Sequence, residues 1–371
     1  MSVTIETPLV ASPIPQKEAK KPNWQQVVKP YQSSDTRTSI IQVCTSIPPF
    51  FVMWYVTYRS LALSFYPITL FLAFLTAMFA MRCFIILHDA GHGSFFKNQK
   101  WNDFFGIITG MITFTPYFAW RHSHAIHHAS SGDLDRRGTG DVWTLTYEEY
   151  HTKPLATRAF YRLYRNPFVI FVVGPTIDFV ILQRLPTVNV SDKAREKYSV
   201  VYTNITLLVL AIVMSLLIGV KDFVLVQLPV IAMASSLGVF LFYVQHQFED
   251  AYWARHKDWN YAEAALHGSS FFKMGPIMKF FTGNIGFHHI HHLSPKIPNY
   301  KLEACHYENE MFEEVAVMTW RSSLKSIKIR TFDEDRGKMI GYYRDDEHEH
   351  QEVVEAPAPI ETKSGLLPAI D

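Results

Sequence analysis

Four stretches of the chain are apolar for long enough to cross a bilayer, which takes about 20 residues of helix. They cover residues 40–58, 67–87, 200–220 and 223–244. The last two are separated only by Lys221 and Asp222, and neither has the polar face of a helix at the surface of a soluble protein. The pattern predicts four transmembrane helices arranged as two hairpins.

Two further apolar stretches, residues 104–120 and 167–182, are shorter and interrupted. The first contains Gly106, Gly110 and Pro116, and the second contains Gly174, Pro175 and Asp178. Interrupted runs of this length are typical of re-entrant or surface-lying segments. We therefore expect neither stretch to cross the membrane.

Two hairpins place the N-terminus, residues 88–199 and everything after residue 245 on one side of the bilayer. The other side keeps only two short turns, near residues 59–66 and 221–222. Nearly all other lysines and arginines then lie on the first side, which the positive-inside tendency identifies as cytoplasmic. We expect an all-α, multi-pass membrane protein whose connecting segments form a cytoplasmic helical cap.

Composition agrees with a membrane protein and sets the domain limits. Of the 371 residues, 48% are hydrophobic and only 19% are charged, which is unusual for a soluble chain. A net charge of +1 gives no field that would attract nucleic acid, and the three scattered cysteines form neither a disulfide framework nor a zinc ligand set. The polar stretches 1–37 and 344–371 are predicted to be disordered tails, which leaves one domain over residues 38–343.

Histidines are concentrated in four places along the chain. The segments are "HDAGH", "RHSHAIHH", "VQHQFED" and "FHHIHH". His88 and His92 are spaced i, i+4, so they share one face of a helix. The spacing i, i+3, i+4 occurs twice, in His124, His127 and His128 and again in His288, His291 and His292. Each triplet is predicted to direct its imidazoles toward one point.

The first pair and His246 directly follow the second and fourth apolar stretches, so all four groups fall on the same predicted side. Nine imidazoles are one more than two four-coordinate zinc ions can bind. A haem is held by single histidines that face each other, not by triplets with the spacing i, i+3, i+4. Two six-coordinate transition metals fit better, with iron the natural choice because it binds imidazole and reacts with dioxygen. His122 and His289 are out of helical phase with the others. Four isolated histidines are interpreted as structural or surface residues: His151, His256, His267 and His306.

"HDAGH", "HAIHH" and "HHIHH" resemble the three histidine boxes of the membrane fatty acid desaturase family, HxxxH, HxxHH and HxxHH. The surrounding segments "SSGDLDRRGTGDVW", "RLYRNP", "FYVQHQFEDAYW" and "TGNIGFHHIHHLSPKIPNYKLE" are most similar to bacterial acyl-lipid desaturases of the Bacillus phospholipid type. The resemblance covers about residues 38–335. It implies a di-iron enzyme that uses O2 to place a cis double bond in a lipid-bound acyl chain.

The resemblance also implies a set of site residues. The metal ligands would be His88, His92, His124, His127, His128, His246, His288, His291 and His292. Asp89 and Asn284, inside or beside the boxes, would orient imidazoles, and Glu249 and Asp250 are either further such partners or surface residues. One departure concerns the iron near His246: animal relatives have an asparagine where this chain has Phe242.

Electrons would have to come from a separate carrier, because the chain contains no GxGxxG and no haem-binding HPGG motif. The resemblance implies ferredoxin or flavodoxin in a bacterial cell membrane, or cytochrome b5 in the endoplasmic reticulum of a eukaryote. Fatty acyl or carotenoid hydroxylases and ketolases share the histidine boxes and stay open as an alternative. A second alternative is a membrane metal transporter or metal-binding protein. Transport, however, predicts ionisable ligands inside the membrane spans, whereas these histidines follow the apolar stretches.

Overall fold

The apolar stretches form the long helices of the protein. A computed structural model describes residues 23–186 and 193–344, and four of its helical segments are long and apolar enough to cross a membrane. These segments are Thr36–Leu63, α4 (Tyr66–His92), α10 (Ala194–Ile218) and α11 (Val220–His246). The predicted spans are thus confirmed as helices: three extend beyond both predicted limits, whereas α10 begins earlier than predicted but ends at Ile218.

The first segment is divided by its prolines. It consists of α2 (Thr36–Cys44), α3 (Ile47–Ser60) and the short 3-10 helix η2 (Leu61–Leu63). Pro48 and Pro49 lie in the first turn of α3. A proline is tolerated there because the first turn does not need its N–H for a hydrogen bond within the helix. The chain therefore restarts its helix at Ile47 instead of kinking in the middle.

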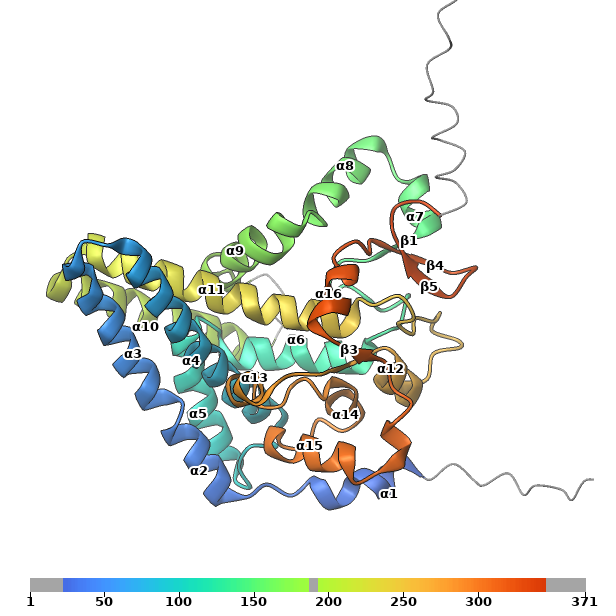
Figure 1. Ribbon diagram of the computed structural model, residues 1–371, viewed down its shortest axis with the longest axis horizontal. Helices are drawn as coiled ribbons and strands as arrows, with labels where there is room; N and C mark the ends of the chain where they lie inside the picture. The colour runs from blue at the N-terminus through green and yellow to red at the C-terminus, as the bar shows by residue number, and fades with distance from the viewer. Residues whose placement is uncertain (1–22, 187–192, 345–371) are drawn as a thin grey trace, which may run out of the picture.

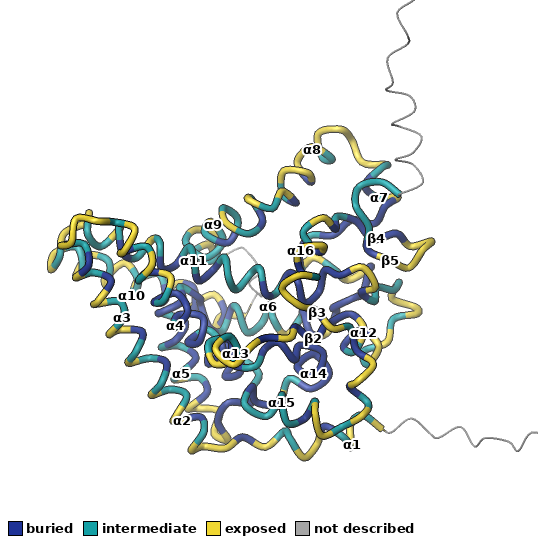
Figure 2. The backbone as a smooth tube through the Cα atoms, in the orientation of Figure 1, coloured by how far each residue is buried: buried dark blue, intermediate teal, exposed yellow. Residues whose placement is uncertain are grey.

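Burial separates the inner helices from the outer ones. In the most apolar stretch of α4, 61% of the residues are buried, whereas in that of α10 only 6% are. Leu216 and Leu217 near the end of α10 are 82% and 72% exposed. A helix that exposes apolar side chains on every side is stable only when lipid surrounds it. Figure 2 shows the buried backbone gathered along α4 and α14 and the exposed backbone along the outer elements, including α8.

The two interrupted stretches do not form single straight helices. Residues 104–120 are shared by α5 (Gln99–Ile112) and α6 (Tyr117–Ser130), with a turn between them in which Phe114 has φ 58°. A Cβ on Gly106 would lie 2.3 Å from the Tyr117 ring, so a glycine is required where the two helices touch. The second stretch contains the π-helical turn η3 (Val169–Val173), α9 (Gly174–Val180) and η4 (Leu182–Arg184). It is bent by 61° from α8 (Leu155–Tyr164).

The remaining described residues cover one end of the long helices (Figure 1). They form α1 (Trp24–Val28), η1 (Lys29–Tyr31), α7 (Tyr147–Thr152), α12 (Tyr261–His267), α13 (Pro276–Thr282), α14 (His288–Leu293), α15 (Asn299–Tyr307), η5 (Glu310–Phe312) and α16 (Trp320–Ser326). The tail predicted for residues 1–37 therefore contains helices in its described part, and Val28 is fully buried. Residues 1–22 and 345–371 of the predicted tails lie outside the described residues.

The structure is mostly helical, but the all-α prediction missed two small sheets. Strands β1 (Leu145–Thr146), β4 (Thr331–Asp333) and β5 (Lys338–Ile340) form the first, with Leu145 opposite Thr331 in parallel register and β4 antiparallel to β5. Strands β2 (Phe271–Phe272) and β3 (Val317–Met318) form the second and are parallel. Strands of two or three residues are too short to show an alternating pattern in the sequence. They attach the C-terminal segment to the rest of the cap.

Candidate metal centre

Nine imidazoles from four helices meet where α4 and α11 end against α6 and α14. The ring nitrogens of one set all lie within 4.8 Å of one another: His88, His92, His124, His128 and His291. A second set satisfies the same limit: His127, His246 and His292. His288 joins this second set, because its Nε2 lies 2.9 Å from Nε2 of His246. We call them the five-histidine and the four-histidine group.

Each triplet divides between the two groups, contrary to the prediction that it points to one place. On α6, His124 and His128 belong to the five-histidine group while His127 belongs to the other. Consecutive residues on a helix differ by about 100° in direction. Consequently His127 and His128, like His291 and His292, face different points. One turn of helix thereby contributes to both groups and keeps them adjacent.

Burial favours the neutral form of five of these imidazoles. The desolvation of the ring, followed by the charges of neighbouring histidines, holds the pKa well below its usual value in five residues outside the long apolar helices: His124, His128, His288, His291 and His292. Nε2 of His291 lies 3.0 Å from Nε2 of His128, which in turn lies 3.2 Å from Nε2 of His124. A neutral imidazole has one N–H and one lone pair, so the site presents converging lone pairs.

The donor set fits two transition metal ions. Several buried ring nitrogens have no hydrogen-bond partner: His92 Nε2, His127 Nε2, His128 Nδ1, His288 Nδ1 and His292 Nε2. A buried polar atom without a partner lowers the stability of the fold. A cation at the centre of each group would provide a partner for the ring nitrogens that face it. Neutral nitrogen donors favour iron and related metals over magnesium or calcium, which prefer oxygen.

Two carboxylates orient one histidine in each group. Asp89 accepts a hydrogen bond from Nδ1 of His88 at 3.0 Å, and Asp141 accepts one from Nδ1 of His127 at 2.5 Å. Such a bond fixes the ring and leaves Nε2 for a metal. The Nδ1 atom of His246 is 3.2 Å from the carbonyl oxygen of Gly268, which has the same effect.

Asp89 is itself held in place by a buried network. Its Oδ2 accepts bonds from the backbone N–H and the side-chain amide of Asn299, at 2.7 and 2.8 Å. The Asn299 side chain is bonded in turn to Gln42 on α2, at 2.8 and 3.1 Å. Helix α2 is thereby connected to His88. Asp141, Asn299 and Gln42 were not among the predicted site residues, because none of them lies on the same helix as the histidine that it supports.

The other candidate residues lie farther from the imidazoles. The side-chain amide of Asn284 donates to the carbonyl oxygen of Asn299 at 3.4 Å. Asn284 is therefore connected to Asp89 through Asn299. Glu249 and Asp250 are exposed and pair with Lys338 at 3.3 and 3.2 Å, which agrees with their interpretation as surface residues. Phe242 packs its ring 5.0 Å from both His127 and His246. An apolar ring therefore faces the four-histidine group.

The remaining histidines of the described ranges lie outside both groups. His289 is buried and pairs with His306 at 3.2 Å, pointing away from both groups. His151 contacts the Tyr342 carbonyl and His256 contacts Asp133. His267 lies 3.5 Å from Glu263, and His122 is in neither group.

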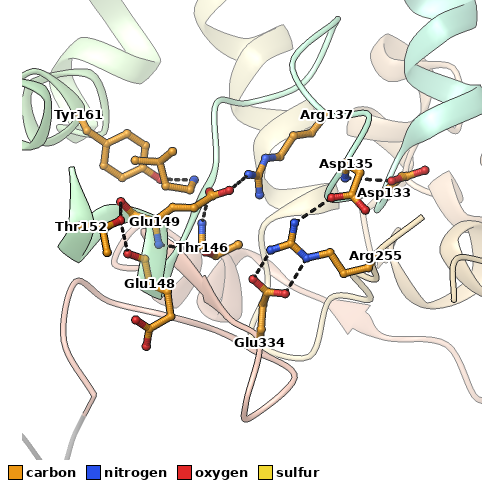
Figure 3. Close-up of polar contacts among 11 residues, drawn as sticks. Asp133, Asp135, Arg137, Thr146, Glu148, Glu149, Thr152, Tyr161, Arg255 and Glu334 are labelled. Atoms are coloured by element: carbon orange, nitrogen blue, oxygen red, sulfur yellow. Dashed lines mark hydrogen bonds and ion pairs between the residues drawn. The ribbon is translucent and has the colours of Figure 1, made fainter. Parts of the chain in front are cut away.

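Ion pairs hold the loop that carries Asp141. Arg255 binds Asp135 at 2.8 Å and Glu334 at 2.6 Å, so it connects the loop after α6 to the turn after β4 (Figure 3). Farther along the same loop, Arg137 pairs with Glu149 in the capping box that begins α7. The segment 137–149 around Asp141 is therefore closed by an ion pair between its two ends, and the residues just before it are attached to the turn after β4.

A cavity of about 680 Å³ lies against the histidines. Its wall includes His88, His124 and His288, together with many apolar side chains of α4, η3, α9 and α11. This volume lies within the ordinary range of ligand sites. Phe242 lines the cavity and packs against His127 and His246, whereas His288 of the four-histidine group lies in the cavity wall itself.

Comparison with known proteins identifies relatives over most of the chain. A sequence model of the family described as "Fatty acid desaturase" matches residues 64–322, which include all nine histidines. A "Fatty acid desaturase" of Bacillus subtilis is 44% identical over 315 residues, or 85% of this chain and 89% of that protein. An "sn-1 oleoyl-lipid 12-desaturase" of Synechocystis is 29% identical over 60% of this chain and 63% of its own length. An "sn-1 acyl-lipid omega-3 desaturase (ferredoxin)" of Nostoc is 28% identical over 70% of this chain and 73% of its own length.

Proposed function

The chain belongs to the fatty acid desaturase family, and we propose that it places a cis double bond in the acyl chain of a membrane lipid. Two hydrogens leave adjacent methylenes, and one O2, two external electrons and two protons account for the two water molecules formed. The observation that carries the proposal is the pair of histidine groups in the wall of an apolar cavity.

We propose that two iron ions bind, one in each histidine group. His88, His92, His124, His128 and His291 would hold the first, and His127, His246, His288 and His292 the second. The chemistry that such ions supply with O2 is the oxidation of C–H bonds that are too weakly acidic for a protein base to attack. With four histidines and Phe242 beside it, the second position has room for a further ligand.

The chain's own residues would bind and orient the substrate. The apolar wall removes water from the reacting methylenes, and the aromatic rings of Phe84, Trp120 and Phe242 confine the chain beside His88 and His124. Asp89 and Asp141 hold their imidazoles in the orientation that leaves Nε2 directed inward. Positional selectivity must come from this confinement, because neighbouring methylenes are chemically alike.

The names of two relatives support a proposal for the substrate and the electron carrier. The names of the Synechocystis and Nostoc proteins specify lipid-bound acyl chains, and that of the Nostoc protein includes ferredoxin. We propose the same substrate class and an external carrier of the ferredoxin or flavodoxin type in a bacterial cell membrane. Supplying purified protein with reduced ferredoxin, flavodoxin or cytochrome b5 in turn, and comparing product yield, tests the choice of carrier.

We propose that the metal centre faces the cytoplasm and that the long helices cross the bilayer as two hairpins. The turns near residues 61–65 and 219–222 would then lie on the opposite side. Cysteines placed singly at Ser64 and Lys221 should react with a membrane-impermeant thiol reagent only from the outside of intact cells. A cysteine at Lys153 should react only after the cells are opened. The opposite pattern would contradict the topology.

The activity is tested by expression in a host that has no such enzyme, followed by fatty acid analysis with double-bond localisation. We expect products two mass units lighter than their precursors, whereas a hydroxylase would add an oxygen. The variant His291→Ala should abolish desaturation, and His122→Ala serves as the matched control because His122 is in neither group. Full activity of His291→Ala would contradict the proposed ligand set.

A further inference from the structure

Two polar side chains line the otherwise largely apolar part of the cavity that is formed by α9 and η4. They are Asp178 and Gln183, and the amide N–H of Gln183 donates to Oδ2 of Asp178 at 2.8 Å. A carboxyl group in apolar surroundings is costly unless it is paired. Ionisable residues at membrane depth therefore usually mark a place where the protein acts on a substrate.

The hydrogen bonding of this pair is incomplete. The amide of Gln183 has two N–H donors, of which Asp178 takes one, and its Oε1 is buried without a partner. The neighbouring Arg184 uses Nη2 to bind the carbonyl of Phe114, whereas its Nε and Nη1 atoms are buried without partners. Phe114 itself has φ 58°, a strained conformation for a bulky residue. Strain and unpaired donors at one place are typical of a ligand site.

The pair lies near the histidine end of the cavity. Phe179, next to Asp178, packs 6.2 Å from Phe84, which lies one turn before His88. The opposite end of the cavity lies far down the long helices. Its lining residues on α11 extend from Gln245 to Ile231, which is about 21 Å at 1.5 Å per residue.

The far end has apolar walls. Ala80, Ile231 and Ala234 line it, and the hydroxyl of Ser235 bonds within its own helix at 3.1 Å. A hydrocarbon chain is therefore accommodated at the far end and a polar group at the near end.

We propose that Asp178 and Gln183 bind the carbonyl of the linkage that joins the acyl chain to its carrier, and that the position of the double bond is therefore counted from that carbonyl. Asp178 orients the Gln183 amide, whose second N–H donates to the carbonyl oxygen. The hydrocarbon then passes the histidines and continues toward Ile231. This inference rests on the proposed function and adds to it the group that fixes the register.

A neutral carbonyl fits this site better than a phosphate. The carboxyl group of Asp178 would repel an anion bound directly to Gln183, whereas a carbonyl needs only one donor. An ester of a phospholipid and a thioester of coenzyme A both offer that carbonyl. The experiment therefore includes both as substrates.

The test uses the full chain, loaded with iron, in lipid nanodiscs with a supply of reduced ferredoxin. The variants Gln183→Leu and Asp178→Asn remove the donor and the charge, respectively, without leaving a large cavity. Thr176→Ala is the matched control, because Thr176 lies on the same helix outside the cavity wall and bonds only to the Val172 carbonyl. Iron content equal to that of the unaltered protein shows that each variant is folded.

In the unaltered protein we expect one double-bond position, counted from the carbonyl, in phospholipids with acyl chains of different length. In Gln183→Leu we expect products spread over neighbouring positions and a KM raised about fivefold, with kcat changed much less, because one hydrogen bond to the substrate is lost. An alkyl-ether phospholipid, which has no carbonyl, should give the same spread with the unaltered protein. Comparison of phospholipid with acyl-coenzyme A identifies the carrier of the carbonyl.

Unchanged positions and KM in both variants, with desaturation intact, would overturn the inference and leave the proposed function standing. A double bond that keeps its distance from the methyl end when the chain is lengthened would also overturn it. Absence of any desaturation by the iron-loaded, reduced, unaltered protein would instead overturn the proposed function. If Asp178→Asn loses its iron, the result for Gln183→Leu decides.

Discussion

Asp141 offers the sharpest test of how the protein prepares its imidazoles for metal. Its Oδ1 lies 2.5 Å from Nδ1 of His127, and the two side chains are only 8% and 2% exposed. Replacement by leucine removes the acceptor and leaves a buried N–H without a partner. Replacement by asparagine keeps an acceptor but removes the charge. His127 should consequently lose its fixed orientation in the first variant and keep much of it in the second.

The size of the effect follows from the kind of bond. A buried hydrogen bond to a charged group contributes about 1.5–3 kcal/mol, which corresponds to roughly a 10- to 100-fold change in an equilibrium constant. Loss of outer partners of metal-bound histidines weakens metal binding by about the same factor. We therefore expect iron affinity at the four-histidine group to fall about 100-fold in Asp141→Leu and about tenfold in Asp141→Asn.

The assay is competition for iron with a chelator, followed by measurement of the iron retained per chain. Glu148→Gln is the control, because Glu148 is an exposed carboxylate in the first turn of α7, just beyond the segment that carries Asp141. We expect the control to retain its iron and Asp141→Leu to lose one ion before the other. Equal affinities in Asp141→Leu and the unaltered protein would refute the role given to Asp141.

Three further predictions follow from buried groups. Arg165 is a fully buried cation that donates to neutral acceptors of Trp143, Tyr243, Gln247 and Ile329. Arg165→Leu should therefore destabilise the protein by about 3 kcal/mol, because these buried acceptors lose their donor. An unchanged melting temperature would contradict this prediction. Because burial lowers the pKa of His124, His128 and His291, protons should compete with metal at these rings only below the ordinary imidazole pKa of about 6.5. Iron measured after dialysis should then be retained at pH 6.5 and lost at lower pH, and complete loss at pH 6.5 would count against the site. Phe242→Ala should open His127 and His246 to the cavity and lower the yield of desaturated product per O2 consumed, whereas an unchanged ratio would show that Phe242 does not shield these two histidines.

The parts of this site that the sequence predicts are those encoded within one helix. His88 and His92, or His288 and His292, are one turn apart, so their proximity follows from helix geometry alone. The apolar stretches are equally local, and their limits were close to those of the helices. The division of each triplet between two groups also follows from the 100° between consecutive residues, but only once the partners on other helices are in place.

The supporting residues depend on contacts between distant segments. Asp89 meets Asn299 more than two hundred residues later in the chain, and Leu145 of β1 pairs with Thr331 of β4. No local periodicity encodes such contacts, and strands this short carry no pattern. The segment 23–35 was assigned to a disordered tail because it is polar, yet Val28 is buried in the same cluster as Ile290 and Leu293. Packing against α14, which carries the fourth histidine segment, rather than local hydrophobicity, orders these residues.

The most direct test of the account is the metal content and metal environment of active, purified protein. We predict two irons per chain, and an X-ray absorption spectrum that shows nitrogen ligands from imidazole with a second metal nearby. A content well under two irons in fully active protein, or a spectrum dominated by oxygen or sulfur ligands, would contradict the central claim that these histidines bind a pair of irons.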